Sequence, residues 1–243
     1  MTAPRALAVE LAALHLDRPD PSNSLVVACR TAMSRNCSVG LTLAVDAALG
    51  QRVSLAAVGP LARRGEALQV NLGEGPCVEA LSRRASVLVP DLDDADATAN
   101  WPVYAAQARG SGIRAAFAFP AARPQREGPQ PGVVLSVYRD RSGSLPKEDL
   151  DTARAHVDAA ELLLLTVSAP GDEDATDTWL LPFDAVVHQA TGMISSRHAL
   201  TITQALALLR AHAYTRNTDL ADLARAVVHD GLRLPGPPEA PEN

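Results

Sequence analysis

Several arginines in the C-terminal part of the chain alternate with leucine and alanine at helical spacing. Once the apolar stripe of each helix faces inward, these arginines must lie on the surface, together with one tyrosine and one asparagine. Arginine, an aromatic ring and an amide suit phosphate contacts, base stacking and base-edge hydrogen bonds in RNA loops. Ordinary solvated side chains are the alternative. The set is Arg197, Arg210, Tyr214, Arg216, Asn217 and Arg225.

One cysteine follows a glycine-rich turn in the stretch NLGEGPCVEAL. Cys77 would be a candidate nucleophile if a histidine lay beside it. The alternative, which we favour, is a turn into a helix in which Gly73 and Gly75 give backbone freedom and Cys77 is buried. No GxSxG, HExxH, phosphate-loop, kinase or phosphatase motif is present. We therefore expect no catalytic residue and no enzymatic activity.

Two groups of side chains suggest a metal ion only at first sight. The run DLDDADATANW at 91–101 has four aspartates but lacks the ligand spacing of an EF-hand. We expect a solvated loop that closes over a pocket, with Trp101 as its apolar anchor. The C-terminal histidines do not fall two to a helical turn. No metal site and no cofactor are therefore expected. These histidines are His188, His198, His212 and His229.

The composition indicates a globular protein without a general attraction for polyanions. The chain has 243 residues, 47% of them hydrophobic, and a formal charge of -6 from 22 basic and 28 acidic residues. This length suits one large domain or two small ones, and any anion-binding site must be local. Cys29, Cys37 and Cys77 form no CxxC pair, which indicates reduced structural thiols. No signal peptide or membrane span is predicted, so we expect a cytoplasmic protein without a membrane partner.

The elements that position these residues fall on either side of an acidic stretch, SAPGDEDATDT. It reads as a linker because a Pro-Gly pair is followed by acids with almost no apolar residues. We divide the chain into an N-terminal segment at 1–19, an α/β domain at 20–168, the linker at 169–178, a helical module at 179–235 and a disordered tail at 236–243. The fold class is α+β, an antiparallel sheet with flanking helices followed by an all-α bundle.

The α/β domain is predicted to contain one helix at 24–33, six strands and a final helix at 147–168. The apolar stripe of the final helix is narrow and suits pairing with another helix. The strands are predicted at 37–47, 52–59, 67–73, 85–92, 113–121 and 132–140.

The C-terminal module is predicted to contain three helices. The first begins near Pro182, and the second begins with a capping box formed by Thr201 and Gln204. The third follows residue 217 or 218 and ends near Gly231, which is free to adopt the left-handed conformation. Their predicted buried positions are Phe183, Val186, Val187, Ala190, Met193, Ile194, Ala205, Leu206, Leu208, Leu209, Ala213, Leu220, Leu223, Ala224, Val227 and Val228.

The pattern AxGMIxxRHxLTxxQALxLLRxHAxxxNxxLxxLARAVV resembles the ANTAR domain, the RNA-binding module of bacterial antitermination regulators. The resemblance spans 179–235. Residues 20–168 resemble a GAF domain more loosely, through LGEGPCVEAL, VLVPDL, FAFPA and GVVLSVYR. The GAF resemblance implies a six-stranded antiparallel sheet with helices on one side and a small-molecule or regulatory pocket on the other. Candidate pocket residues are Cys77, Trp101, Phe117 and Phe119.

The ANTAR resemblance implies a homodimer that grips paired stem-loops in a transcript leader and prevents a terminator hairpin from forming. Arg197 and Arg210 are then the leading RNA contacts, ahead of the other surface residues named above. The apolar stripes at 150–167 and 183–194 would supply the dimer seam. The alternative is a ligand- or redox-sensing protein whose C-terminal helices serve dimerisation or protein docking without RNA.

Four positions carry further expectations from the ANTAR resemblance. Ala190 and Gly192 should permit close helix packing. Thr191 stands where the family commonly has lysine, so a phosphate contact is expected to be missing. Ala199 stands where the family commonly has glycine, and a left-handed helix end there would be strained by about 1 kcal/mol.

Overall fold

The computed structural model describes residues 3–34, 36–46, 51–121, 132–167, 185–216 and 218–236. The chain divides into two compact units, Met1–Trp179 and Leu180–Asn243. Three predicted features lie outside the described residues: the linker at 169–178, the start of the first C-terminal helix at Pro182 and Phe183, and residues 237–243 of the tail. In the described part of the chain, no helix is long and apolar enough to cross a membrane.

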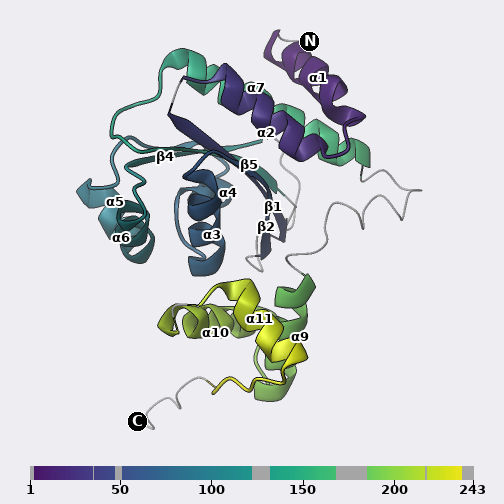
Figure 1. The fold of residues 1–243 in the computed structure, drawn as a ribbon, viewed down its shortest axis with the longest axis vertical. Helices are drawn as coiled ribbons and strands as arrows, with labels where there is room; N and C mark the ends of the chain where they lie inside the picture. The colour runs from purple at the N-terminus through teal and green to yellow at the C-terminus, as the bar shows by residue number, and fades with distance from the viewer. Residues whose placement is uncertain are drawn as a thin grey trace. The chain divides into compact units, whose positions relative to one another are not determined.

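The N-terminal unit is built on a five-stranded antiparallel sheet with the order β2-β1-β5-β4-β3 (Figure 1). The first and last strands along the chain are neighbours at its centre, with Cys37 paired to Arg139 and Ala44 to Gly132. Five of the predicted strands are therefore confirmed. The strands are β1 (Cys37–Asp46), β2 (Gln51–Val58), β3 (Val87–Val89), β4 (Ala115–Pro120) and β5 (Gly132–Arg139).

The predicted strand at 67–73 is wrong, because this stretch forms the end of helix α3 (Ala62–Leu72). Glu66 and Gln69, three positions apart, are both buried on one side of this helix. The helix ends at Gly73, which has a φ of 70° and donates its N–H to the carbonyl of Gln69. The alternation of polar and apolar residues resembled a strand, but the buried positions follow the helical period.

Helices cover both faces of the sheet, whereas the GAF resemblance implied helices on one side (Figure 1). One layer consists of α1 (Ala3–Leu16), α2 (Pro21–Ala32) and α7 (Lys147–Val167). The other consists of α3, α4 (Pro76–Arg83), α5 (Ala95–Asn100) and α6 (Pro102–Gly110). The predicted helix at 24–33 corresponds to α2, which begins with Pro21 after the capping residue Asp20.

The apolar stripe of α7 packs inside its own unit. Ala153, Val157 and Ala160 are at most 1% exposed, and α7 contacts α1, α2, β4 and β5. The stripe does pair with another helix, as its narrowness predicted, but the partner is α1 of the same chain. The prediction that residues 150–167 form an intermolecular seam is therefore wrong.

The C-terminal unit contains three helices in its described residues: α9 (Ala185–His198), α10 (Ile202–Thr215) and α11 (Leu220–His229). The capping box is confirmed, since Gln204 N donates to Thr201 Oγ1 over 3.2 Å and Thr201 N donates to Gln204 Oε1 over 2.9 Å. Gly231 follows α11 with a φ of 69°, also as predicted. Met193, which was predicted to be buried, is 37% exposed. The buried apolar core includes Val187, Ala190, Ile194, Ala205, Leu206, Leu209, Ala213, Leu220, Ala221, Leu223, Ala224, Val227 and Leu234.

Helix α9 ends at a residue with a left-handed backbone. Ala199 has a φ of 51°, Leu200 N donates to Ser195 O over 3.1 Å, and Ser195 Oγ donates to Leu200 O over 2.7 Å. These bonds close the helix end in the way that usually employs glycine. The predicted strain at Ala199 is thus present in the backbone.

A short segment after α11, residues 231–236, packs back on the bundle and is called the C-terminal strap below. Leu234 is only 2% exposed. The Nε2 atoms of His198 and His212 lie 3.1 Å from the carbonyl oxygens of Leu234 and Pro235, respectively. Because a carbonyl oxygen can only accept, both rings carry their proton on Nε2. The C-terminal strap is therefore part of the bundle, although it follows the third helix.

Candidate functional sites

The arginines proposed to contact RNA lie at the ends and outer sides of α9 and α10. Arg197 is exposed near the end of α9, and Arg216 is exposed directly after α10. Arg210 is half-buried on α10, and Tyr214, four residues later, is 54% exposed. Asn217 lies outside the described residues. Since residues four apart share a helix side, Arg210 and Tyr214 are neighbours on α10.

The C-terminal strap leaves Tyr214 open to solvent. Helix α10 buries Ala205, Leu209 and Ala213, and His212, next to Ala213 on the chain, binds the carbonyl of Pro235. At 100° per residue, His212 and Tyr214 lie on opposite flanks of this buried side. The strap therefore binds the flank with His212, and Tyr214 on the other flank is 54% exposed.

Arg225 has an acidic partner on its own helix. Its Nη1 lies 2.5 Å from Asp222 Oδ1, one turn earlier on α11. Both side chains are about half exposed, so the pair adds at most about 1 kcal/mol to stability. The carboxylate nevertheless offsets the positive charge that a phosphate would contact.

One residue of the Ala-Thr-Gly stretch differs from its expected role. Thr191 is 2% exposed, and its Oγ1 donates to Val187 O over 2.7 Å. Its side chain is therefore part of the bundle core rather than of the proposed RNA surface. Gly192 is exposed, and a Cβ added there would meet nothing within 4 Å. The prediction that Gly192 permits close helix packing is wrong, although Ala190 is fully buried as expected.

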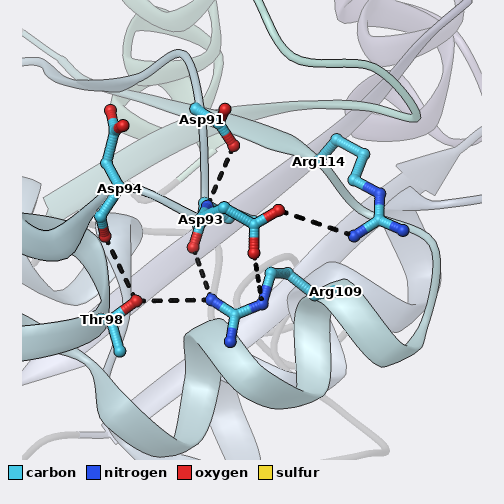
Figure 2. Close-up of polar contacts among 7 residues, drawn as sticks. Asp91, Asp93, Asp94, Thr98, Arg109 and Arg114 are labelled. Carbon is cyan, nitrogen blue, oxygen red and sulfur yellow. Dashed lines mark hydrogen bonds and ion pairs between the residues drawn. The ribbon is translucent and has the colours of Figure 1, made fainter.

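Two arginines, Arg109 and Arg114, contact the acidic run at 91–101 (Figure 2). Asp93 forms ion pairs with Arg109 Nε at 3.1 Å and with Arg114 Nη1 at 4.0 Å. Arg109 Nη1 also donates to Leu92 O over 2.7 Å. Part of the run folds as α5 rather than as a loop, and Trp101 is buried as the predicted apolar anchor. Among the residues with described positions, no three His, Cys, Asp or Glu side chains are grouped to hold a metal.

The four candidate pocket residues do not lie together. Cys77 and Trp101 belong to one buried cluster beneath α3, α4 and α6, with Ala116 and Ala118 of β4. Phe117 and Phe119 alternate with those alanines and therefore point to the opposite face of the sheet, which α2 and α7 cover. The prediction of a common pocket is wrong because the period of two along β4 separates the aromatic rings from the cysteine.

A buried polar network lies on the face of the sheet that carries Cys77. Tyr138 OH donates to Glu66 Oε1 over 2.6 Å and accepts from Gln69 Nε2 over 2.7 Å. Thr42 Oγ1 contacts Glu66 Oε2, and the backbone N–H of Cys77 donates to Gln69 Oε1 over 2.6 Å. The chain of bonds thus joins β1, β5, α3 and α4.

Burial in this network favours the neutral forms of its acidic groups. Burial raises the pKa of Glu66, although hydrogen bonds from Thr42, Tyr138 and Ser136 oppose the shift. Burial, and secondarily the proximity of Glu66, raises the pKa of Cys77. Since the thiolate is the reactive form, the burial and the raised pKa of Cys77 both oppose a role as nucleophile.

The glycine-rich turn before Cys77 has a structural use that sequence reasoning missed. Glu74 Oε1 accepts from the backbone N–H groups of Val103 over 3.0 Å and Tyr104 over 2.7 Å, which caps the N-terminus of α6. Gly75 has a φ of 125°, and a Cβ there would lie 2.8 Å from Gln69 Oε1. The turn therefore joins α3, α4 and α6.

Comparison with known proteins gives one match to a family model. Residues 184–228 match the ANTAR domain. No curated protein matches the chain. A solved structure of type II free methionine-R-sulfoxide reductase from Thermoplasma acidophilum is 17% identical, with 64% of this chain and 96% of that chain covered and a TM-score of 0.41. This likeness is too low to support an argument about activity. The ANTAR match supports a regulatory, RNA-binding role for the C-terminal unit.

Proposed function

We propose that this protein regulates transcription by binding RNA stem-loops through its C-terminal unit and thereby preventing termination. One observation carries the proposal: the region that matches the ANTAR domain carries exposed Arg197, Tyr214 and Arg216 and the half-buried Arg210. Arginine contacts phosphates, and an exposed tyrosine offers a face on which an unpaired base stacks.

The charge balance favours recognition of structured loops over general binding to nucleic acid. With a formal charge of -6, the whole chain repels a polyanion at long range. If about four arginines contact phosphates of single-stranded loops, a plot of log Kd against the logarithm of the salt concentration should have a slope of roughly 3. Specificity then rests on splayed bases, and affinity on two modules that bind two stem-loops together.

The N-terminal unit serves in this proposal as a GAF-like sensor whose signal controls the RNA-binding unit. The buried network around Glu66 supports such a role, because a network that joins β1, β5, α3 and α4 links several elements through few bonds. The signal is a small molecule that alters this network, and the active form is a homodimer.

The test is the affinity for a fluorescent RNA with two short hairpins, measured by anisotropy at several salt concentrations. Arg210→Ala should weaken binding about tenfold or more, the equivalent of about 1.4 kcal/mol. Arg63→Ala is the matched control, since it removes the same charge from an exposed position outside the residues that match the ANTAR domain. Equal effects of both changes, or no saturable binding by the unaltered protein, would overturn the proposal.

Tyr214 provides a second variant pair on the same helix. Tyr214→Phe keeps the ring and should bind RNA as the unaltered protein does, whereas Tyr214→Ala should lose affinity. Since Tyr214 is 54% exposed, neither change should alter the circular dichroism of the bundle. A similar loss in both variants would show that the hydroxyl, rather than stacking, carries the contact.

A further inference from the structure

The path of the C-terminal strap over the bundle is fixed by its backbone and by one buried side chain. Gly231 has a φ of 69°, and Leu232 N donates to Ala226 O over 3.0 Å, which turns the chain back at the end of α11. Leu234 then enters the core, where it is 2% exposed. The residues between Gly231 and Leu234 are therefore held at a defined place on the bundle.

Two histidines bind successive carbonyl groups of the strap. His198, the last residue of α9, donates to Leu234 O, and His212, in the last turn of α10, donates to Pro235 O. A Cβ added at Gly236 would lie only 3.0 Å from His198 Nδ1, so the chain passes close against this ring. The strap therefore crosses from the end of α9 to the last turn of α10.

This crossing brings an arginine from outside the matched region close to two arginines inside it. Arg197 directly precedes the histidine of α9, and Arg216 follows the histidine of α10 by four residues, about one helical turn. Arg233 directly precedes the first of the two bound residues of the strap and lies beyond residues 184–228, which match the ANTAR domain. All three arginines are exposed. Three separate elements therefore contribute a cation to one side of the bundle.

These three arginines keep their charge for an external anion. Within the described residues, Arg197, Arg216 and Arg233 form no ion pair, whereas Arg225 is paired with Asp222 at 2.5 Å. An arginine without a carboxylate partner offers its planar guanidinium to a phosphate through charge-assisted hydrogen bonds. Because the adjoining helices match an RNA-binding family, the phosphates of an RNA backbone are the anion that this surface fits.

We propose that the strap adds Arg233 to the RNA-binding surface, so that Arg197, Arg216 and Arg233 together contact backbone phosphates of the RNA. This inference rests on the proposed function and names a contact that lies beyond the matched helices. Tyr214 is exposed on the other flank of α10. The strap side of the bundle therefore binds phosphates, while the opposite flank of α10 offers a ring on which a loop base stacks.

The first test is the affinity of Arg233 variants for the fluorescent two-hairpin RNA, measured by anisotropy at several salt concentrations. Arg233→Ala should weaken binding about threefold or more at low salt and lower the slope of log Kd against the logarithm of the salt concentration by about 0.7 or more, because a phosphate contact is lost. Arg233→Lys keeps the charge and should keep the slope. Arg63→Ala, at an exposed position of the N-terminal unit, is the matched control and should change neither quantity.

The second test asks whether the strap acts through Arg233. Leu234→Ala removes the buried anchor of the strap, and His212→Ala removes one of its hydrogen bonds while leaving the core intact. Each change should weaken RNA binding in the unaltered protein but have little further effect in the Arg233→Ala background, because the contact that the strap positions is already absent. A loss that persists in that background would show that the strap acts through the fold of the bundle and would overturn the inference.

Arg210→Ala separates a failure of this inference from a failure of the proposed function. If Arg210→Ala weakens RNA binding while Arg233→Ala behaves like Arg63→Ala, the contact at Arg233 is wrong and the proposed function stands. If the unaltered protein shows no saturable binding to the RNA, both are wrong. Circular dichroism of each variant checks that the bundle is folded, and Arg233→Ala should leave the spectrum unchanged because its side chain is exposed.

Discussion

At the scale of single residues, Ala199 carries strain that one substitution can remove. A left-handed backbone costs a residue with a Cβ about 1 kcal/mol more than glycine. Ala199→Gly should therefore stabilise the C-terminal unit by up to about 1 kcal/mol, since some of the gain is lost to the greater freedom of glycine in the unfolded chain. Slower amide hydrogen exchange in α9 and α10 would report this change.

The control for Ala199→Gly is the same substitution inside a helix. Ala207 is exposed in the middle of α10, where glycine costs about 1 kcal/mol relative to alanine. Ala207→Gly should speed hydrogen exchange in the same peptides. If Ala199→Gly also speeds it, the left-handed helix end is not the strained element that its φ of 51° indicates.

Glu66 makes the stability of the N-terminal unit depend on pH. Because its pKa is raised in the folded state, folding binds the proton more tightly. The contribution of Glu66 to stability is therefore fully present below its ordinary pKa of 4.5 and is lost as the pH rises through its folded-state pKa. Glu66→Gln keeps the shape and removes this titration, so its urea midpoint should vary less between pH 4.5 and 8.

Glu148→Gln is the matched control for Glu66→Gln, because Glu148 is exposed at the start of α7. This variant should keep the pH dependence of the unaltered protein. A Glu66→Gln variant with an unchanged pH slope would mean that Glu66 is charged in the folded protein. Trp101 fluorescence reports on the correct unit, since this ring is buried in the cluster near Cys77.

Residue-level expectations were reliable where the local sequence determines the conformation. The capping box at Thr201 and the left-handed Ala199 both follow from residues within one turn of the helix. The network around Glu66 was missed because its partners Thr42 and Tyr138 lie far away along the chain. A single sequence gives no sign that a glutamate surrounded by arginine and glycine is buried.

At the scale of elements, the cap of α6 is supplied by the turn between α3 and α4. Glu74→Ala should destabilise the N-terminal unit by about 1–2 kcal/mol, because it leaves the N–H groups of Val103 and Tyr104 without this acceptor. Glu74→Gln keeps an acceptor but loses the charge at the helix N-terminus, so its effect should be smaller. Urea unfolding followed by Trp101 fluorescence measures both, and equal losses would assign the effect to charge alone.

The C-terminal strap should contribute to the stability of the bundle although it lies beyond the third helix. Leu234→Ala removes a buried side chain and should cost about 2 kcal/mol or more. Arg233→Ala, at an exposed position of the same strap, should be nearly neutral. Hydrogen exchange in α9 and α10 reports both changes, and an unchanged rate in Leu234→Ala would show that the strap is not part of the core.

The sequence pattern predicted which side of an element is apolar, but it did not predict which element packs against that side. The narrow apolar stripe of α7 correctly indicated that this helix packs against another helix. The sequence did not predict that this other helix is α1 of the same chain. Phe117 and Phe119 were correctly placed on a strand, yet which face they occupy depends on the register of β4 against β5. Periodicity indicates which residues share a side of an element and not what that side contacts.

At the scale of the whole molecule, the proposed function requires two copies of the chain to bind one RNA together. An RNA with two hairpins should then bind about 100-fold more tightly than an RNA with one. Arg210→Ala should weaken binding to both RNAs, because it removes a contact from each copy. Anisotropy with the two RNAs measures the ratio, and equal affinities for the two RNAs would contradict joint binding by two copies.

The order of strands in the sheet has a consequence for how the protein is made. Because β1 lies beside β5, the centre of the sheet joins Cys37 to Arg139, and that pairing waits until both strands have left the ribosome. At about 5–20 residues per second, β1 spends several seconds without its central neighbour. The three-helix bundle has contacts that are local in sequence and folds quickly once it is synthesised. Formation of the sheet is therefore the slow step of folding. While β1 lacks its neighbour β5, the nascent chain is most prone to aggregation.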